Sequence, residues 1–302
     1  MKAKTEKTEN VRRRKIVKHD TAFDYVNIAL LVVLALLCLY PMWFVIVGSF
    51  NKGYDYLKGG VYFWPRTFTW ANYAVVLADN RIWQGLLMTV IRCLIGPVLH
   101  IFLCSIVAYG MSRKELHGKK FFNIFGLITM FFSGGLVPFY VLCKMLGMLN
   151  TFAMYILPGA YSVYNMILIR SFIKGIPEEL HEAAVVDGAG EFRIYFTMII
   201  PLSMPILMTV LLWGILGHWN DYTTTMFYTP ANRNIYTLQY ILMLIIQEGN
   251  VQSNVGSAVS GEAASETISL AAMVIGTIPM LIGFPFLQKY FTKGLYVGSL
   301  KG

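Results

Sequence analysis

Apolar runs of about twenty residues recur along this chain of 302 residues, and they restrict its fold more than any other feature. A helix of about that length crosses the roughly 30 Å hydrocarbon core of a bilayer. Only 14% of the residues are charged, whereas soluble domains hold about 25%. We therefore predict an all-α membrane protein with six transmembrane helices, at about 26–47, 83–109, 121–142, 152–173, 199–219 and 268–290.

The basic residues determine the expected orientation. Residues 1–20 form a basic tail, and residues 21–302 form one transmembrane domain with a charged loop at 174–198, between the fourth and fifth helices. Of the 25 Lys and Arg residues, eighteen lie on the side of the N-terminus, six lie on the opposite side, and Arg92 lies within a helix. Because positively charged loops stay in the cytoplasm, we expect both termini and the 174–198 loop there. The net charge of +9 then reflects membrane orientation and does not indicate binding to nucleic acid.

The sequence contains no recognisable motif for chemistry of its own. It has no G-x-x-x-x-G-K-[ST] phosphate loop, no H-E-x-x-H pair and no G-x-S-x-G turn. The four cysteines lie in or at the ends of apolar runs and lack the spacing of metal ligands. An intramembrane enzyme keeps ionisable catalytic groups within its spans, and these spans hold almost none. We expect a protein that is not an enzyme and binds no metal or cofactor itself.

The few polar groups inside the predicted helices are candidates for a solute pathway. Arg92 and His100 are eight residues apart, close to two helical turns, and so lie on roughly one face. A buried arginine in a membrane marks a pathway or a paired charge, although Arg92 could also reach the interface with its long side chain. Asn165, in the fourth helix, is a further pathway candidate or a hydrogen-bonding contact between helices.

Aromatic and amide groups gather near the outer end of the fifth predicted helix. Trp213, Trp219 and Asn220 combine flat rings with a donor and an acceptor. Such mixtures suit sugars, whose C–H faces stack on rings while their hydroxyls need fixed polar partners. The aromatic belt found at any membrane interface is the competing interpretation.

Two predicted outer segments are long. Residues 51–82 carry Trp64 and Trp70 and are expected to form short helices on the membrane surface. Residues 220–267 begin with an aromatic part and continue, from Gly249 to Glu266, as a stretch of small and polar residues. That composition predicts a mobile loop, and connections of this length are usually functional or disordered.

The 174–198 loop contains a short amphipathic helix with recognisable ends. Pro177 suits the first helical position, Glu178 and Glu179 meet the positive end of the helix dipole, and Gly188 permits the left-handed conformation that ends a helix. The helix has a small, weakly apolar face that another protein can approach closely. This face consists of Leu180, Ala183, Ala184 and Asp187.

This helix resembles the EAA motif of ABC-importer permeases, which reads E-A-A, three residues, G, nine residues, then I-x-L-P. Here Glu182-Ala183-Ala184 is followed by Gly188 and, nine residues later, by Met198-Ile199-Ile200-Pro201. The two departures, Met198 and Ile200, replace one apolar residue with another. Further runs are similar to carbohydrate-importer permeases of the maltose-permease MalG type and, more closely, the LplC type. These runs are 134–138, 146–151, 157–159 and 294–302.

The resemblance implies a permease subunit that moves a carbohydrate, expected to be an oligosaccharide, into the cytoplasm. Its implied partners are a second, homologous permease, an ABC ATPase dimer that holds ATP and Mg²⁺, and an extracytoplasmic solute-binding protein that meets residues 220–267. The residues implied to couple this chain to the ATPase are Glu182, Ala183, Ala184, Asp187, Gly188 and Pro201.

Two other classes of protein remain open from the residues alone. A secondary transporter or channel would need an ion-coupling site or a charged pore within the spans. A non-transporting scaffold would use the 174–198 helix only to recruit a partner. ATP hydrolysis by an assembled complex, with and without a solute-binding protein and sugar, distinguishes the three.

Overall fold

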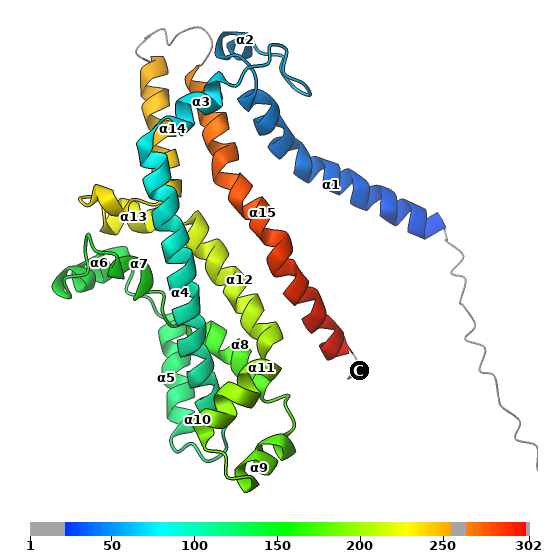
Figure 1. Ribbon diagram of the computed structural model, residues 1–302, viewed down its shortest axis with the longest axis vertical. Coiled ribbons are helices and arrows are strands. Elements are labelled where there is room, and N and C mark those ends of the chain that lie inside the picture. The colour runs from blue at the N-terminus through cyan, green and yellow to red at the C-terminus, as the bar shows by residue number, and fades with distance from the viewer. Residues whose placement is uncertain (1–21, 255–263, 300–302) are drawn as a thin grey trace, which may run out of the picture. The chain divides into compact units, whose positions relative to one another are not determined.

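A computed structural model describes residues 22–254 and 264–299 of the chain, and the regular elements of these two ranges are helices. The chain divides into two compact units, Met1–Phe44 and Val45–Gly302. The first helix, α1 (Ala22–Ser49), begins in the first unit and ends in the second. The remaining helices belong to the second unit (Figure 1).

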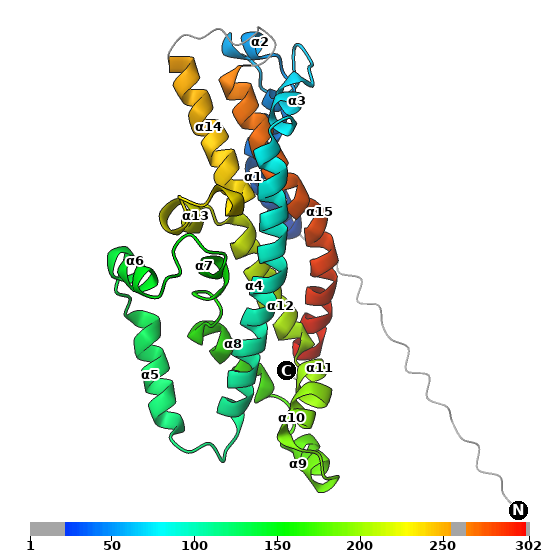
Figure 2. The same ribbon diagram turned by 60° about the vertical axis from the view of Figure 1, so that its left-hand side comes forward.

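Long apolar helices occupy three of the predicted spans. They are α1, α4 (Asn80–Ser112) and α15 (Ser265–Ser299), and each contains a segment long and apolar enough to cross a membrane. Continuous apolar sequence is sufficient for such helices, because every backbone polar group is satisfied within the helix. In the second unit α4 runs beside α12, and α9 and α14 lie near opposite ends of α4 (Figures 1 and 2).

The segment predicted as one helix at 121–142 is two helices. The helices α5 (Lys119–Phe131) and α6 (Leu136–Met145) meet at an angle of 113°. The break contains Gly134 and Gly135, and Gly135 has a φ of 83°, which glycine adopts without a steric cost. The apolar composition is continuous through the bend, so composition alone did not reveal it.

The segment predicted as one helix at 152–173 is also interrupted. A single turn, α7 (Ala153–Ile156), is separated from α8 (Val163–Ile173) by six residues that include Pro158. Ser162 then caps α8 by accepting a hydrogen bond from the backbone N–H of Asn165. At eleven residues, α8 is too short to cross a bilayer alone.

The fifth predicted span, 199–219, contains a sharp bend near its start. Residues 191–202 comprise α10 (Glu191–Ile194), the π-helix η1 (Tyr195–Ile199) and α11 (Ile200–Leu202). They meet α12 (Met204–Asn220) at 78°. Pro201 and Pro205 flank the bend at Ser203. Proline cannot donate the backbone hydrogen bond that would continue a helix, so these residues favour a bend here.

The two long segments predicted to lie outside contain several short helices and one longer helix. Residues 51–82 contain the predicted short helices, α2 (Gly53–Leu57) and α3 (Ala71–Leu77). Residues 220–267 contain α13 (Thr223–Tyr228), η2 (Arg233–Ile235) and α14 (Leu238–Asn254).

Most of α14 comes before the stretch predicted as a mobile loop. Leu238, Ile241, Leu242 and Ile245 follow a helical period and pack against α4 and α15 in a core cluster. The predicted mobile stretch, 249–266, overlaps the end of α14 and the start of α15. Its residues 255–263 lie outside the described residues.

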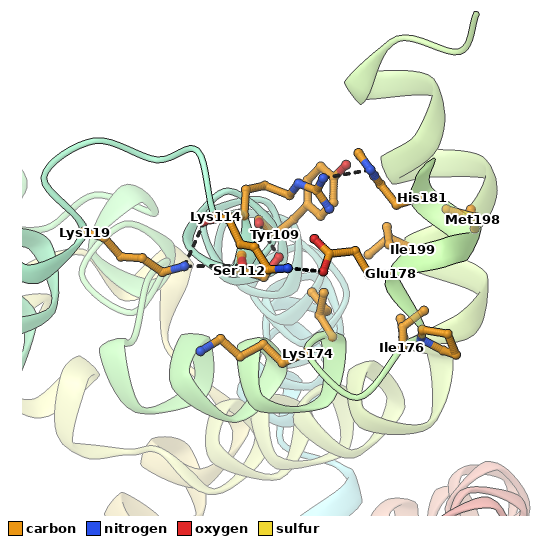
Figure 3. Close-up of a pocket in the computed structure, with 13 residues that line it drawn as sticks. Tyr109, Ser112, Lys114, Lys119, Lys174, Ile176, Glu178, His181, Met198 and Ile199 are labelled. Atoms are coloured by element: carbon orange, nitrogen blue, oxygen red, sulfur yellow. Dashed lines mark hydrogen bonds and ion pairs between the residues drawn. The ribbon is translucent and has the colours of Figure 1, made fainter. Parts of the chain in front are cut away.

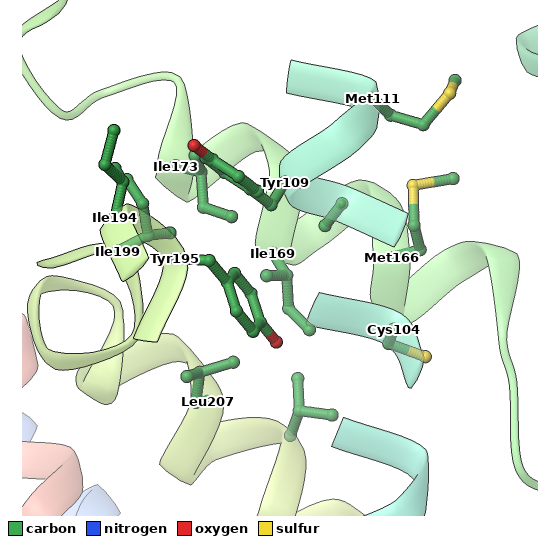
Figure 4. Packing of buried hydrophobic residues seen from close by; sticks show 12 residues of the cluster. Cys104, Tyr109, Met111, Met166, Ile169, Ile173, Ile194, Tyr195, Ile199 and Leu207 are labelled. Carbon is green, nitrogen blue, oxygen red and sulfur yellow. The ribbon is translucent and has the colours of Figure 1, made fainter. Parts of the chain in front are cut away.

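The largest buried cluster lies between α4, α8, η1 and α12, near α9. Tyr195 and Ile169 occupy its centre and are almost fully buried (Figure 4). The Tyr195 hydroxyl is 2.7 Å from Ser105 Oγ of α4, so this polar group is satisfied inside the cluster. The cluster joins the base of α4 to the chain segment that follows α9.

Candidate coupling helix and central cavity

The helix α9 (Glu178–Val186) is the charged helix predicted within the 174–198 loop. Pro177 is the residue before the first helical position, not the first position itself, and Glu178 and Glu179 lie in the first turn. Gly188 has a φ of 78° and donates its N–H to the carbonyl of Val185. Ala189 donates to the carbonyl of Ala184, which completes the expected glycine-terminated helix end.

A buried histidine attaches α9 to α4. His181 points inward with 7% of its surface exposed, and its Nδ1 lies 2.7 Å from an Arg113 nitrogen. Because a guanidinium only donates, Nδ1 accepts this bond and Nε2 carries the hydrogen that faces Glu191 Oε1 at 3.2 Å. Tyr109 of α4 also donates to Glu191. Sequence analysis did not single out His181, because a histidine inside a charged motif does not reveal which way it faces.

An ion pair at the first turn adds a second connection. Lys114, in the loop after α4, donates to the Glu178 carboxylate. This hydrogen bond, reinforced by the charge of Lys114, holds the pKa of Glu178 below its ordinary value of 4.5. Both side chains are substantially exposed, so the pair orients α9 more than it stabilises the fold.

The predicted coupling residues do not share one environment. Glu182, Ala183, Asp187 and Gly188 are exposed, whereas Ala184 is half-buried and packs against the Tyr195 cluster. Pro201 is exposed on α11, a separate element. Val186, which is 86% exposed, lies on α9 beside the predicted residues. The free surface of α9 is therefore a carboxylate next to small and apolar side chains.

A cavity of about 390 Å³ lies between α4, α12 and the segments that carry α6–α8 and α13. It collects four of the six predicted pathway residues from three helices: Arg92, His100, Asn165 and Trp213. Aromatic side chains add further lining from other elements, namely Phe139, Tyr155 and Tyr228. The cavity thus combines aromatic rings with polar groups. The sequence indicated such a combination around Trp213.

Arg92 is paired within the cavity wall. Only 2% of Arg92 is exposed, and its guanidinium lies 2.7 Å from a carboxylate oxygen of Asp221. Its Nε donates to His218 Nδ1 at 3.3 Å, and its Cζ lies 4.5 Å from the centre of the Tyr155 ring. Burying a charge is costly unless it is paired and hydrogen-bonded, and these partners offset that cost for Arg92. The partners come from α12, its C-terminal end and α7, so the spacing along α4 could not indicate them.

His100 and Asn165 form a second polar pair in the wall. His100 Nδ1 lies 2.7 Å from the carbonyl oxygen of Gly159, so Nδ1 carries the hydrogen. Nε2 then accepts from the Asn165 amide nitrogen at 2.8 Å. The bond to Gly159 holds the interrupted 157–162 segment against α4.

The structure does not bring Trp219 and Asn220 into the cavity. Trp219 is 6% exposed and donates through Nε1 to the carbonyl of Gly276 in α15, at 3.0 Å. Asn220 is exposed and donates to the carbonyl of Leu216 in its own helix. Trp213 and Gly217, one turn apart on α12, line the cavity, and Trp219 lies on another face of that helix. Asn220 follows Gly217 by three residues on the cavity-facing side, but it lies at the exposed end of α12 and is not among the lining residues.

Residues 73–296 match the family model described as "Binding-protein-dependent transport system inner membrane component". The chain belongs to this family. Within the two described ranges no group of His, Cys, Asp and Glu side chains could hold a metal ion. A member of this transport family is a permease subunit and is not itself catalytic.

Individual relatives cover nearly the whole chain. The polygalacturonan/rhamnogalacturonan transport system permease protein YtcP of Bacillus subtilis (strain 168) is 34% identical over 93% of this chain and 98% of its own. Protein LplC of the same organism is 30% identical over 94% and 97%. A crystal structure of a bacterial ABC transporter involved in the import of the acidic polysaccharide alginate contains a chain with 29% identity. It aligns with a TM-score of 0.83 over 91% of this chain and 98% of that chain.

Proposed function

We propose that this permease subunit imports a carbohydrate, of oligosaccharide size, through a binding-protein-dependent ABC transporter. In this proposal the chain crosses the membrane six times, with both termini and α9 in the cytoplasm. A second permease supplies the other half of the pathway. An ATPase dimer hydrolyses ATP, and an extracytoplasmic solute-binding protein delivers the sugar. The transport systems named for the relatives support the substrate class.

The central cavity is the single observation that carries the carbohydrate assignment. Its volume of about 390 Å³ falls within the range of roughly 300–1,000 Å³ for ligand sites. Trp213, Tyr155 and Phe139 offer ring faces, while Asn165 and His100 offer a polar edge. Rings and fixed polar groups together suit a molecule with apolar C–H faces and many hydroxyls. The cavity is only half of a pathway if a second permease faces it.

The exposed face of α9 supports coupling to a separate ATPase. Glu182 is exposed next to Ala183, a side chain small enough for close approach. On the opposite face His181, Arg113 and Glu191 hold α9 to α4. A force applied to the free face is therefore passed to the helix that carries Arg92 and His100. The predicted contact of residues 220–267 with a solute-binding protein remains part of the proposal.

A secondary transporter is the alternative that one observation favours. Arg92, His218 and Asp221 form a buried ionisable cluster, and such groups carry ions in gradient-driven transporters. Asp221, however, also accepts hydrogen bonds from Thr223 and from the backbone of Thr224. These hydrogen bonds, together with Arg92, fix the Asp221 carboxylate as part of the cavity wall.

The energy source distinguishes the two functions. Proteoliposomes that contain the chain and its partner subunits are loaded with ATP, and uptake of a labelled oligosaccharide is measured with solute-binding protein outside. The proposal expects uptake that requires ATP and continues when an ionophore removes the ion gradients. Uptake driven by a proton or sodium gradient without ATP would contradict it.

A further inference from the structure

A second cavity lies at the base of α9, at the opposite end of the bundle from α14. Its volume is about 310 Å³, and it is formed by the end of α4, the start of α5, the end of α8 and the start of α9 (Figure 3). Ile173, Ile176 and Met198 contribute an apolar floor. The predicted pathway residues lie outside this cavity.

Positive charge is in excess among the side chains that line this cavity. Arg113, Lys114, Lys119 and Lys174 are cationic, and Glu178 is the one carboxylate among the lining residues. Arg113, Lys114 and Lys119 come from one stretch, 113–119, and the fold brings Lys174 to them from the end of α8. Cations at this spacing repel one another unless an anion lies between them.

The carboxylates nearby satisfy only part of this charge. Lys114 is paired with Glu178, and Arg113 donates to His181 with Glu115 at 3.8 Å. Lys119 donates to two backbone carbonyls, those of Arg113 at 2.8 Å and Ser112 at 3.3 Å. These acceptors are uncharged. In the described ranges neither Lys119 nor Lys174 forms an ion pair with a carboxylate.

The start of α9 also lies at this cavity. Pro177 and Glu178 are among the lining residues. No side chain caps the first turn, although Glu178 and Glu179 in that turn offset part of the partial positive charge of the helix start. Figure 3 shows Lys119 and Lys174 reaching the cavity from two separate elements while Lys114 turns to Glu178.

We propose that this cavity binds a phosphoryl group, held by Lys119, Lys174 and Arg113. A phosphate ester carries up to two negative charges and three acceptor oxygens, which match several converging donors. A neutral sugar would leave the cations unneutralised, and a metal cation would be repelled. The bound group bridges the loop after α4 and the turn between α8 and α9. It therefore restrains the base of α9 independently of what the transporter carries.

Two sources can supply the same group: the headgroup of an anionic lipid, or a soluble phosphate compound. Full-length protein is placed in phosphatidylcholine nanodiscs, and its thermal unfolding midpoint is measured with increasing inorganic phosphate. Chloride at equal ionic strength is the reference. In a second arm, nanodiscs contain phosphatidic acid and no added phosphate. A saturable rise with phosphate indicates a soluble source, and a rise only with phosphatidic acid indicates a lipid headgroup.

Matched variants locate the site. Lys119→Gln/Lys174→Gln removes the two unpaired cations, whereas Lys120→Gln removes an exposed neighbour outside the cavity lining. We expect the double variant to bind the phosphoryl probe at least about tenfold more weakly, since two charge-assisted contacts are lost. Lys120→Gln and the charge-conserving Lys119→Arg/Lys174→Arg should bind as the native protein does.

The proposal is wrong if neither arm raises the midpoint above the chloride reference. It is also wrong if Lys120→Gln weakens binding as much as the double Gln variant. Because Lys119→Arg/Lys174→Arg keeps the charge, retained binding in that variant shows that a loss in the Gln variant is not a general folding defect.

Discussion

At the scale of single residues, the pairing of charges distinguishes structural from accessible groups. Arg92 is enclosed by Asp221, His218 and Tyr155, whereas Glu182 on α9 is exposed. The sequence indicated that Arg92 was either a pathway residue or a paired charge, and the geometry shows the pair. It could not name the partners, because Asp221 follows Arg92 by 129 residues and only the packing of α12 on α4 brings them together.

His181 provides a prediction at this scale. Replacing it with alanine leaves Arg113 and Glu191 without the imidazole between them, and a lost charge-assisted contact costs about 1–3 kcal/mol. We expect faster amide hydrogen exchange in α9 of His181→Ala. The control is Glu179→Ala, which alters an exposed carboxylate in the same helix. Equal exchange in the two variants would show that His181 does not hold α9.

At the scale of elements, continuous apolar segments were predictable and interrupted ones were not. The runs at 26–47, 83–109 and 268–290 fall within α1, α4 and α15. The runs at 121–142 and 152–173 have the same composition but break at Gly134–Gly135 and around Pro158. Glycine and proline permit a break, yet Pro97 lies inside an unbroken α4. Whether a helix breaks depends on whether neighbouring elements can satisfy the backbone N–H and C=O groups that the break leaves free.

The contact between α4 and α14 provides an element-scale prediction. A Cβ placed on Gly85 would meet Ile241 Cδ1 at 2.5 Å and the Leu238 backbone at 3.1 Å. The side chain can turn, but the backbone of α14 would have to move. We expect Gly85→Ala to lower the unfolding midpoint by the equivalent of about 1–3 kcal/mol, as overpacking does.

Gly110→Ala is the matched control for that contact. It lies in the same helix, and its added methyl would have no neighbour within 4 Å. Alanine is favoured over glycine in a helix by roughly 0.5–1 kcal/mol, so Gly110→Ala should be neutral or stabilising. A Gly85→Ala protein as stable as Gly110→Ala would mean that α14 is not packed closely on α4.

At the scale of the whole molecule, the orientation in the membrane remains a prediction from charge. In a variant without native cysteines, a single cysteine at Lys120 or at Arg233 is treated with an impermeant thiol reagent in intact cells. Both native side chains are exposed. The expected orientation protects the Lys120→Cys protein and labels Arg233→Cys, because the cytoplasmic side is inaccessible to the reagent. The reverse pattern would place α9 outside and remove it from any cytoplasmic ATPase.

The central claim is that the exposed face of α9 couples an ATPase to sugar import. The most direct test measures ATP hydrolysis and oligosaccharide uptake together in proteoliposomes with sugar-loaded binding protein, for the native assembly, Glu182→Ala and the control Glu179→Ala. Glu182→Ala should weaken the ATPase contact by about 1–3 kcal/mol. Stimulated hydrolysis and uptake should therefore fall together in Glu182→Ala and stay near native levels in Glu179→Ala. Native uptake and stimulation in Glu182→Ala would contradict the account.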